Sequence, residues 1–310
     1  MTEYCPHLWK TVTIDHKGDV FHCCKIKPLS LGSIYEKHLS ELLNIPEIQS
    51  VREESLHGTL PCYADCNLIR KPCDVASDIT KVCDYNSLTD LYVDFGMKCN
   101  ICCVMCKQRE KYKTDKRGLT CAILNKNIDY SPFQHIYLQG GEPLYIEECL
   151  KFMDYLSSIG KKYSLLTNGL LIPDSMAKKL ARNAALISIS LNAATKHTHE
   201  QVNKGSSWEK VLENIASVRK YRQESGTSLS INGRMTLTNH SLGEIPLFLK
   251  SFEEFGFDTA NFGYDSATVP KYLEEHPSFK KNLSAQIKVV LADADMKKID
   301  TLRLEQLGLI

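Results

Sequence analysis

The pattern of hydrophobic and polar positions changes near residue 89. Before it, the elements are short. Residues 11–23 alternate between apolar and polar side chains on both sides of a polar turn, so we predict a β-hairpin there. Residues 40–51 carry apolar side chains at helical spacing, although Pro46 interrupts the middle of this stretch. The pattern therefore predicts a small N-terminal domain over residues 1–88.

After residue 88 the chain alternates between apolar strand-like runs and amphipathic helical stretches. Strands are predicted at residues 91–95, 135–138, 163–167, 185–191, 228–236 and 259–262. Helices are predicted at 146–159, 174–183, 208–223 and 243–255. Alternation of this kind indicates βα units with a parallel sheet. Because six units fall short of a complete eight-fold barrel, we predict an α/β fold with a partial (β/α)6 barrel over residues 89–270. A charged helical extension is predicted over residues 271–310.

Composition places the chain among globular proteins with a core of ordinary size. Of its 310 residues, 43% are hydrophobic and 24% are charged, and the net charge is +1. Such a small net charge creates no overall field that would gather nucleic acid or an anionic membrane. The sequence contains no apolar run of 18 residues, and its first residues lack a basic start and an apolar signal segment. We therefore expect a cytoplasmic protein with neither a membrane nor nucleic acid as its partner.

Cysteine is the residue type that changes this picture. The chain has 13 cysteines, and all except Cys121 and Cys149 precede residue 107. In a long chain without a signal peptide, clustered cysteines indicate metal ligands or catalytic thiols rather than disulfides. We assign the two isolated cysteines to the hydrophobic core, since cysteine packs as a small apolar residue.

The densest group of cysteines directly follows the first predicted barrel strand, where parallel α/β folds place their active sites. Cys99, Cys103 and Cys106 have the spacing C-x3-C-x2-C. Three thiolates on one loop can bind three irons of a [4Fe–4S] cube and leave the fourth iron open. Cys102 allows other pairings that would suit zinc, but zinc prefers four ligands and the downstream sequence offers no matching pair.

A second motif lies at the end of the second predicted strand, where the sequence reads Gly140, Gly141, Glu142 and Pro143. Together with the cysteine loop, this motif resembles the radical S-adenosylmethionine (SAM) superfamily. The resemblance implies that these four residues hold the amino group of SAM. Glu142 would offer a carboxylate to the ammonium, and the glycines would let backbone carbonyls approach.

Later strands extend the same resemblance. Residues 167–169 read Thr-Asn-Gly at the end of the third strand. The resemblance implies that Ser190 or Asn192, after the fourth strand, contacts the ribose or carboxylate of SAM. It also implies that Arg234, on the fifth strand, pairs with the SAM carboxylate. Met105 departs from the family pattern, which usually has an aromatic residue near adenine at this position.

The N-terminal cysteines form a separate pattern. Cys5, Gly18 and Cys23 have the spacing C-x12-G-x4-C, and Cys62 and Cys66 follow about 40 residues later. This region resembles the auxiliary-cluster module called SPASM, or its shorter Twitch form. The resemblance implies that the four cysteines hold an auxiliary [4Fe–4S] cluster with no open iron, which suits electron transfer or a structural role.

Four other cysteines leave part of this assignment open. The last pair is C-x3-C where C-x2-C is usual, so Cys73 could replace one of its members, and Cys24 could replace its neighbour. Cys83 and Cys102 have no assigned role, and Cys83 could help to bind a further cluster. A zinc knuckle built from the same N-terminal thiols is the alternative to a cluster.

The resemblance implies an enzyme. A reduced [4Fe–4S] cluster cleaves SAM to methionine and a 5′-deoxyadenosyl radical, which abstracts a hydrogen atom from a peptide or small-molecule substrate. The auxiliary cluster accepts an electron or binds the substrate, and flavodoxin or ferredoxin donates electrons. Two alternatives remain. One is a zinc-binding interaction module on an α/β scaffold, with the basic run at 107–116 contacting nucleic acid. The other is a radical SAM enzyme that modifies nucleic acid.

Overall fold

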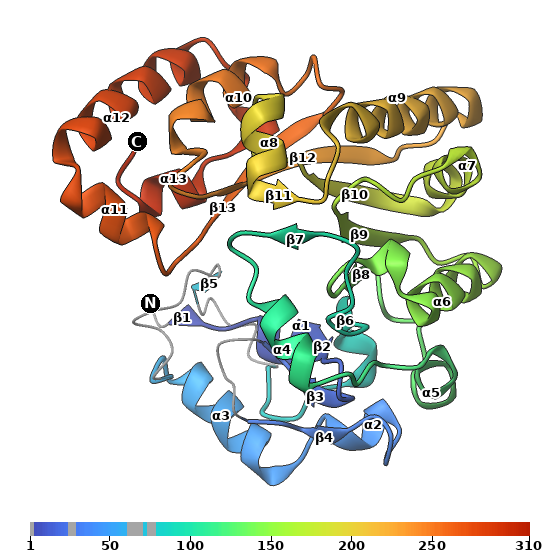
Figure 1. Cartoon of the computed structure of the whole chain (residues 1–310). Coiled ribbons are helices and arrows are strands. Elements are labelled where there is room, and N and C mark those ends of the chain that lie inside the picture. The colour runs from blue at the N-terminus through green and yellow to red at the C-terminus, as the bar shows by residue number, and fades with distance from the viewer. Residues whose placement is uncertain (1–2, 24–28, 61–70, 73–78) are drawn as a thin grey trace. The chain divides into compact units, whose positions relative to one another are not determined.

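The computed structural model of the chain describes residues 3–23, 29–60, 71–72 and 79–310 (Figure 1). The predicted ligands Cys62 and Cys66, and the alternatives Cys24 and Cys73, lie outside the described residues. The chain divides into two compact units, each assembled from segments that are distant in sequence. Unit 1 consists of Met1–Met97, Asp115–Gly141 and Ile146–Ser158. Unit 2 consists of Lys98–Thr114, Glu142–Tyr145 and Ile159–Ile310.

Unit 1 holds the short N-terminal elements and the first two predicted barrel strands. Its strands are β1 (Glu3–Tyr4), β2 (Thr11–Ile14), β3 (Asp19–Phe21), β4 (Gly32–Ser33), β5 (Lys71–Pro72), β6 (Asp90–Asp94) and β8 (His135–Gln139). Its helices are α1 (His7–Lys10), α2 (Leu39–Leu42), α3 (Pro46–Leu56), η2 (Tyr85–Ser87), α5 (Cys121–Asn127) and α6 (Glu147–Ser158).

The sheet of unit 1 joins the N-terminal region to the barrel strands. Its strands lie in the order β8-β6-β2-β3-β4. Strand β6 pairs in parallel with both β8 and β2, whereas β2, β3 and β4 pair antiparallel. The pairing of β2 with β6 therefore carries the sheet of unit 1 from the N-terminal region into the first predicted barrel strand.

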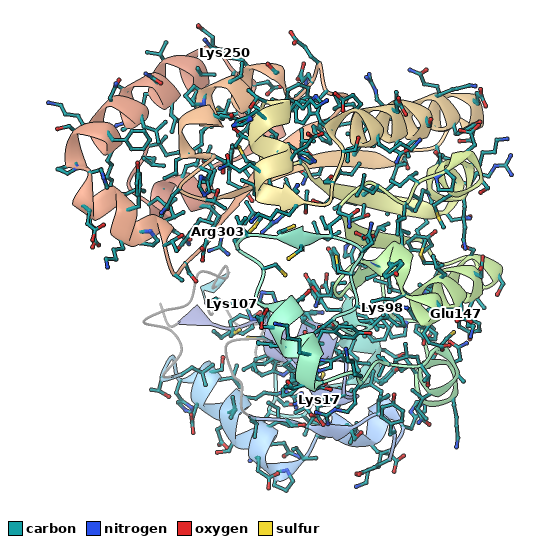
Figure 2. All side chains as sticks on the ribbon, viewed as in Figure 1. Lys17, Lys98, Lys107, Glu147, Lys250 and Arg303 are labelled. Carbon is teal, nitrogen blue, oxygen red and sulfur yellow. The ribbon has the colours of Figure 1, made fainter. Side chains whose placement is uncertain are left out.

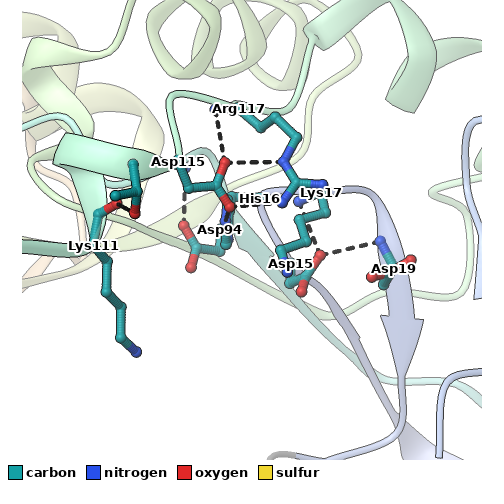
Figure 3. A network of polar contacts seen from close by, with 10 residues as sticks. Asp15, His16, Lys17, Asp19, Asp94, Lys111, Asp115 and Arg117 are labelled. Carbon is teal, nitrogen blue, oxygen red and sulfur yellow. Dashed lines mark hydrogen bonds and ion pairs between the residues drawn. The ribbon is translucent and has the colours of Figure 1, made fainter. Parts of the chain in front are cut away.

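The predicted hairpin is confirmed as β2 and β3 (Figure 3). Asp15 Oδ1 accepts hydrogen bonds from the backbone amides of Lys17 (2.9 Å) and Asp19 (3.1 Å), which closes the turn. Gly18 has φ +88°, and a Cβ there would lie 2.4 Å from the Tyr35 ring, so the turn requires glycine.

The prediction of a single helix over residues 40–51 is wrong, because the structure has two helices in this region. Helix α2 ends at Leu42, and α3 begins at Pro46. A proline at the first helical position loses no hydrogen bond, because that amide has no partner within the helix. Pro46 therefore starts a second helix instead of weakening the middle of a single one.

Unit 2 holds the other predicted barrel strands. Its strands are β7 (Cys102–Cys103), β9 (Tyr163–Thr167), β10 (Ala184–Ser190), β11 (Asn203–Lys204), β12 (Ser230–Leu237), β13 (Thr259–Tyr264) and β14 (Ile299–Asp300). Its helices are α4 (Gln108–Thr114), η3 (Pro143–Tyr145), α7 (Asp174–Asn183), α8 (Lys196–Val202), α9 (Trp208–Ser225), η4 (Leu242–Glu244), α10 (Ile245–Ser251), α11 (Val269–Glu275), α12 (Pro277–Ala292), η5 (Met296–Lys298) and α13 (Leu302–Gln306).

The larger sheet of unit 2 is parallel throughout, with the strand order β14-β13-β12-β10-β9. Helices α7 and α9 pack side by side against this sheet, and α12 packs on α10 (Figure 1). Their apolar faces enclose a core that includes Ile187, Val211, Ile231 and Phe248, all completely buried. The predicted mixed α/β class with parallel strands is confirmed. The C-terminal extension is not purely helical, since β14 extends the sheet beside β13.

Among the residues that the structure describes, no helix combines the length and apolar character needed to cross a membrane.

Candidate functional site

The three motif cysteines lie on a loop of unit 2 that a short β-ladder holds in place. Strand β7 pairs antiparallel with β11, so that Cys103 lies opposite Asn203. The ladder continues where the Val104 amide donates to the Val202 carbonyl at 2.9 Å. Figure 2 shows Lys98 and Lys107 at the two ends of the loop. The sequence predicted the loop but not this ladder, which connects the loop to α8.

The thiols of this loop are partly accessible and electrostatically coupled. Cys99 and Cys103 are half-buried and Cys106 is exposed. Burial first, and then the nearby thiols of Cys106, Cys99 and Cys102, together raise the pKa of Cys103 to about 12. Burial likewise raises the pKa of Cys99. Thiolates that oppose one another's ionisation favour a bound cation, which offsets their shared negative charge.

The donor set of this loop fits an iron–sulfur cluster, whose irons are held by cysteine thiolates. Within the described part of the chain, no group of three or more His, Cys, Asp or Glu side chains has the arrangement of a metal site. The assignment of Cys99, Cys103 and Cys106 to iron therefore depends on their shared loop, their electrostatic coupling and their thiol chemistry.

The two motif glycines follow β8 in unit 1. Gly140 has φ +150°, and a Cβ there would lie only 2.7 Å from the Gly96 carbonyl oxygen. The amide of Gly141 donates to the same oxygen at 2.7 Å. The close backbone approach at these glycines is thus to the loop after β6, and it excludes any side chain at position 140.

Glu142 is 1% exposed and forms hydrogen bonds through both carboxylate oxygens. Its Oε1 accepts from the Thr167 hydroxyl (2.7 Å) and the Leu144 amide (3.1 Å). Its Oε2 accepts from the Asn168 amide (2.7 Å), and its own amide donates to the Lys98 carbonyl (2.9 Å). Burial raises the pKa of Glu142, while its three hydrogen-bond donors lower it. The carboxylate thus fastens the end of β9 beside the cysteine loop.

A second polar contact connects the same two segments. Asn168 Nδ2 donates to Asn100 Oδ1 at 2.8 Å, directly beside the first motif cysteine. Thr167 and Asn168 are both buried. The Thr-Asn-Gly segment seen in the sequence therefore positions the cysteine loop through its side chains. Pro143, the last residue of the other motif, is buried at the start of η3.

Asn192 adopts a left-handed backbone conformation with φ +60° and is 2% exposed. Its Oδ1 accepts from the Thr236 amide at 2.8 Å, and its Nδ2 donates to Asn203 Oδ1 at 2.9 Å. The side-chain amide therefore connects the ends of β10 and β12 to β11. Ser190 is half-buried and lies opposite Arg234 in the parallel register of β10 and β12.

Arg234 is a half-buried cation with a weak partner. Its Nη1 donates to Asn261 Oδ1 at 3.4 Å, and no ion pair joins it to a carboxylate in the part of the chain that the structure describes. A Cβ on Gly263 would lie 2.6 Å from Arg234 Nη2, so glycine makes room for the guanidinium. Burial lowers the pKa of Arg234, but a guanidinium stays charged. Such a group can bind a carboxylate with two parallel hydrogen bonds.

The sequence did not identify Gly263 as a residue of the site, nor the hydrogen bonds around α8. A glycine inside a predicted strand is a signal for close approach, and it could have identified Gly263. His199 of α8 is completely buried, and its Nε2 lies 2.8 Å from Ser206 Oγ. Burial lowers the pKa of His199. Asn203 Nδ2 donates to the Ser190 carbonyl at 3.2 Å, so this region links β10 to the ladder of the cysteine loop.

Cys5, Cys23 and Cys83, the N-terminal cysteines within the described residues, lie in unit 1. Cys5 and Cys23 are buried, and the amide of Cys5 donates to Ser55 Oγ at 2.9 Å. Cys83, which the sequence left unassigned, is 2% exposed, and its thiol donates to the Trp9 carbonyl at 3.5 Å. No disulfide joins any two of the nine cysteines in the described residues. Cys121 and Cys149 are buried, which confirms their assignment to the core.

Comparison with protein families gives two matches along the chain. The radical SAM superfamily model matches residues 93–249. The SPASM model, an iron–sulfur cluster-binding domain, matches residues 5–68. The two matches confirm the predicted classes of cofactor: a cluster that acts with SAM and an auxiliary cluster.

Curated relatives match part of the chain. A probable GTP 3′,8-cyclase of Saccharolobus islandicus is 28% identical over 136 residues, which are 42% of this chain and 43% of the relative. A cysteine-type anaerobic sulfatase-maturating enzyme of Clostridium novyi is 25% identical over 191 residues, which are 55% of this chain and 50% of the relative. The chain thus spans about half the length of the curated relatives it matches.

Solved structures with a similar fold include two peptide complexes. Native anSMEcpe with bound AdoMet and the Kp18Cys peptide has a TM-score of 0.47 and 23% identity, covering 64% of this chain and 59% of that chain. Streptococcus suis SuiB bound to its precursor peptide SuiA has a TM-score of 0.45 and 16% identity, covering 87% of this chain and 65% of that chain.

Proposed function

Since the chain belongs to the radical SAM superfamily, we propose that it cleaves SAM reductively and abstracts a hydrogen atom from a peptide substrate. The observation that carries this proposal is the three-cysteine loop of unit 2, fastened to the end of β9 by the buried Glu142 carboxylate. This arrangement fixes a set of thiols at the carboxyl end of a parallel strand, where α/β folds bind their ligands.

The proposed roles follow from the chemistry of each side chain. When bound, the [4Fe–4S] cluster supplies the electron that breaks a carbon–sulfur bond of SAM. Cys99, Cys103 and Cys106 would hold this cluster. Arg234 would bind the SAM carboxylate, because it is a half-buried cation without an ion-pair partner among the described residues. The proposed set of SAM contacts is Gly140, Gly141, Glu142, Pro143, Ser190, Asn192 and Arg234.

Two of these residues gain a more specific role. Glu142 uses both carboxylate oxygens in hydrogen bonds to neighbouring segments, and Asn192 uses both atoms of its side-chain amide in the same way. We infer that they act mainly as positioning residues, which keep the cysteine loop and the strand ends in place. Ser190 and Arg234 lie in register on adjacent strands, so their side chains can serve the same ligand.

The N-terminal region would hold the auxiliary cluster through Cys5, Cys23, Cys62 and Cys66. The SPASM match covers all four residues.

We propose functional boundaries at residues 1–88 for this module, 89–270 for the barrel and 271–310 for the C-terminal extension. Reduced clusters and reduced thiols suit a cytoplasmic location, with flavodoxin or ferredoxin as the electron donor.

A peptide substrate is supported by the sulfatase-maturating relative, whose name describes action on a protein. The auxiliary-cluster module matched in this chain is consistent with that class. A small-molecule nucleotide is the second candidate, because the relative from Saccharolobus islandicus is named as a GTP cyclase. The two candidates differ in the molecule that loses a hydrogen atom.

The test is SAM cleavage by the anaerobically reconstituted chain with dithionite. We expect 5′-deoxyadenosine to form, and the Cys99→Ala/Cys103→Ala/Cys106→Ala variant to form none. Cys102→Ala, in the same loop but outside the motif, is the matched control and should retain the activity. Undiminished product from the triple variant would overturn the proposal.

The substrate class is tested by deuterium transfer. The enzyme is incubated with a deuterated cysteine-containing peptide or with deuterated GTP, and 5′-deoxyadenosine is analysed by mass spectrometry. Deuterium transferred from the peptide supports the first candidate. Transfer from GTP alone would replace it with the second.

A further inference from the structure

Arg52 of α3 is 0% exposed and lies in unit 1, outside the proposed SAM site. A guanidinium has five N–H donors, and all five are used here. Its acceptors are the Leu8 carbonyl (2.9 Å), Asn44 Oδ1 (3.0 Å), the Lys81 carbonyl (3.2 Å), the Leu43 carbonyl (2.9 Å) and His22 Nε2 (2.8 Å). Every one of these acceptors is a neutral group or a ring nitrogen.

No carboxylate pairs with Arg52 within the residues that the structure describes. The Trp9 ring lies 5.9 Å from its guanidinium carbon and contributes a cation–π contact. Neither an aromatic ring nor carbonyl dipoles carry a net negative charge. The nearby Cys83 thiol does not supply one either, because burial raises its pKa and favours the neutral thiol. A buried cation without a counter-charge is expensive, so folded proteins usually place an anion near it.

The surroundings of Arg52 point to the anion. Ser55, one helical turn further along α3, accepts the hydrogen bond of the Cys5 amide. His22, bonded to Arg52 Nη2, directly precedes Cys23. Asn44 Oδ1, bonded to Nη1, also accepts from the Cys83 amide at 2.8 Å. The guanidinium is therefore bonded to segments that carry the N-terminal cysteines.

We propose that Arg52 is the fixed positive charge that offsets the negative charge of the auxiliary cluster and raises its reduction potential. This inference rests on the proposed function, since it requires the auxiliary cluster. A cluster held by four thiolates carries a net negative charge, which grows by one when it accepts an electron. A nearby cation favours the reduced form, because net charge is one of the factors that set cluster potentials.

The effect acts through charge and not through hydrogen bonds to sulfur, because neutral acceptors already use every N–H of the guanidinium. This distinguishes Arg52 from a residue that is only structural. A purely structural role would require the hydrogen bonds and would be insensitive to a neighbouring negative charge. The role proposed for Arg52 depends on the net charge of its guanidinium together with the groups around it.

The decisive variant is Asn44→Asp. It places a carboxylate where Asn44 Oδ1 now accepts from Arg52, so the positive charge is neutralised while the guanidinium keeps its partners. Asn44→Ser is the matched control: like the aspartate, it loses the bond from Asn44 Nδ2 to the Cys83 carbonyl (2.9 Å), but it adds no charge. Arg52→Met removes the charge directly, and Arg52→Lys keeps it.

The measurement is the midpoint potential of the auxiliary cluster, followed by electron paramagnetic resonance in the 310-residue chain with Cys99→Ala/Cys103→Ala/Cys106→Ala. We expect Asn44→Asp and Arg52→Met to lower the equilibrium constant for reduction about tenfold, which is about 59 mV for one electron. Asn44→Ser and Arg52→Lys should stay near the parent value. An unchanged potential in Asn44→Asp, with the cluster present, would overturn the role of Arg52.

The same protein separates this inference from the proposed function. If the triple-alanine protein binds no iron and gives no cluster signal after reconstitution, the auxiliary cluster itself is wrong. If the cluster is present but insensitive to charge at Asn44, only the role of Arg52 is wrong. Because Asn44→Asp retains Arg52 and its hydrogen bonds, the test does not depend on the folding of Arg52→Met.

Discussion

The two cysteine-bearing regions differ in how their thiols meet solvent and in the charge at their centre. The loop of unit 2 has two half-buried thiols and one exposed thiol, and its central buried charge is the Glu142 carboxylate. The N-terminal region of unit 1 has buried thiols at Cys5 and Cys23, and its central buried charge is the Arg52 guanidinium. Accessible thiols suit a cluster that must admit a ligand, whereas buried thiols suit one that only exchanges electrons.

The hydrogen bonds of the two buried charged groups also run in opposite directions. Glu142 accepts three hydrogen bonds from neutral donors, and Arg52 donates five to neutral acceptors. Each region thus fastens distant segments around one buried charge whose hydrogen bonds are satisfied locally. The sign of that charge matches the proposed ligands: a carboxylate near a site for a cationic sulfonium compound, and a cation near an anionic cluster.

The largest expected effect comes from removing the thiols of each region separately. We propose that the chain carries two clusters, or about eight irons. Removing the cysteine thiols of either region should therefore reduce the iron content by about four per chain. Cys99→Ala/Cys103→Ala/Cys106→Ala should also abolish 5′-deoxyadenosine formation, whereas Cys5→Ala/Cys23→Ala should not abolish it. Iron analysis and product assays after reconstitution measure both. Loss of all iron from either variant would show that the regions are not independent.

The next effect concerns the buried carboxylate of unit 2. Glu142→Ala leaves the Leu144 amide, the Thr167 hydroxyl and the Asn168 amide without their acceptor. Each unpaired buried donor costs about 1–3 kcal/mol, so the free energy of unfolding should fall by about 3 kcal/mol or more. Denaturant unfolding measures this loss, and Glu142→Gln should lose less because it keeps one acceptor oxygen. A Glu142→Ala protein as stable as the parent would contradict the positioning role.

A smaller effect should separate SAM binding from cluster binding. Arg234→Ala should weaken SAM about 10- to 100-fold, since a hydrogen bond to a charged group contributes about 1.5–3 kcal/mol. Iron content should not change. Gly263→Ala should weaken SAM less, because the added Cβ displaces the guanidinium without removing its charge. Equilibrium binding of SAM measures both variants, and parent-like affinity in Arg234→Ala would exclude this residue from the site.

The smallest effect is a pH dependence that belongs to unit 2. Burial lowers the pKa of His199, so the unfolded chain binds a proton more readily than the folded one. The stability that neutral His199 contributes is present above its unfolded pKa of about 6.5 and is lost as the pH falls below it. The slope is at most about 1.4 kcal/mol per pH unit. Melting temperatures at pH 7.5 and 5.5 should differ less in His199→Gln than in the parent, and an equal difference would refute the assignment.

Most of the fold could be predicted from the order of residues along the chain. Every barrel strand predicted from residues 91–95 to 259–262 occurs as β6, β8, β9, β10, β12 or β13, and helix α7 has the predicted bounds. These elements have local causes, since a period of two or of 3.6 residues can be read within a short window. The spacing of Cys99, Cys103 and Cys106 and the turn at Gly18 are local in the same sense.

The features that organise the two regions depend on tertiary structure. Glu142 and Thr167 are 25 residues apart and Arg52 and His22 are 30 apart, and no local pattern brings such pairs together. The ladder between β7 and β11, and the space that Gly263 leaves for Arg234, likewise require the folded sheet. The sequence alone therefore determined which elements form and which chemistry they carry. Only the packing of distant segments decided which charges are buried, because burial is a property of what surrounds a residue and not of its neighbours along the chain.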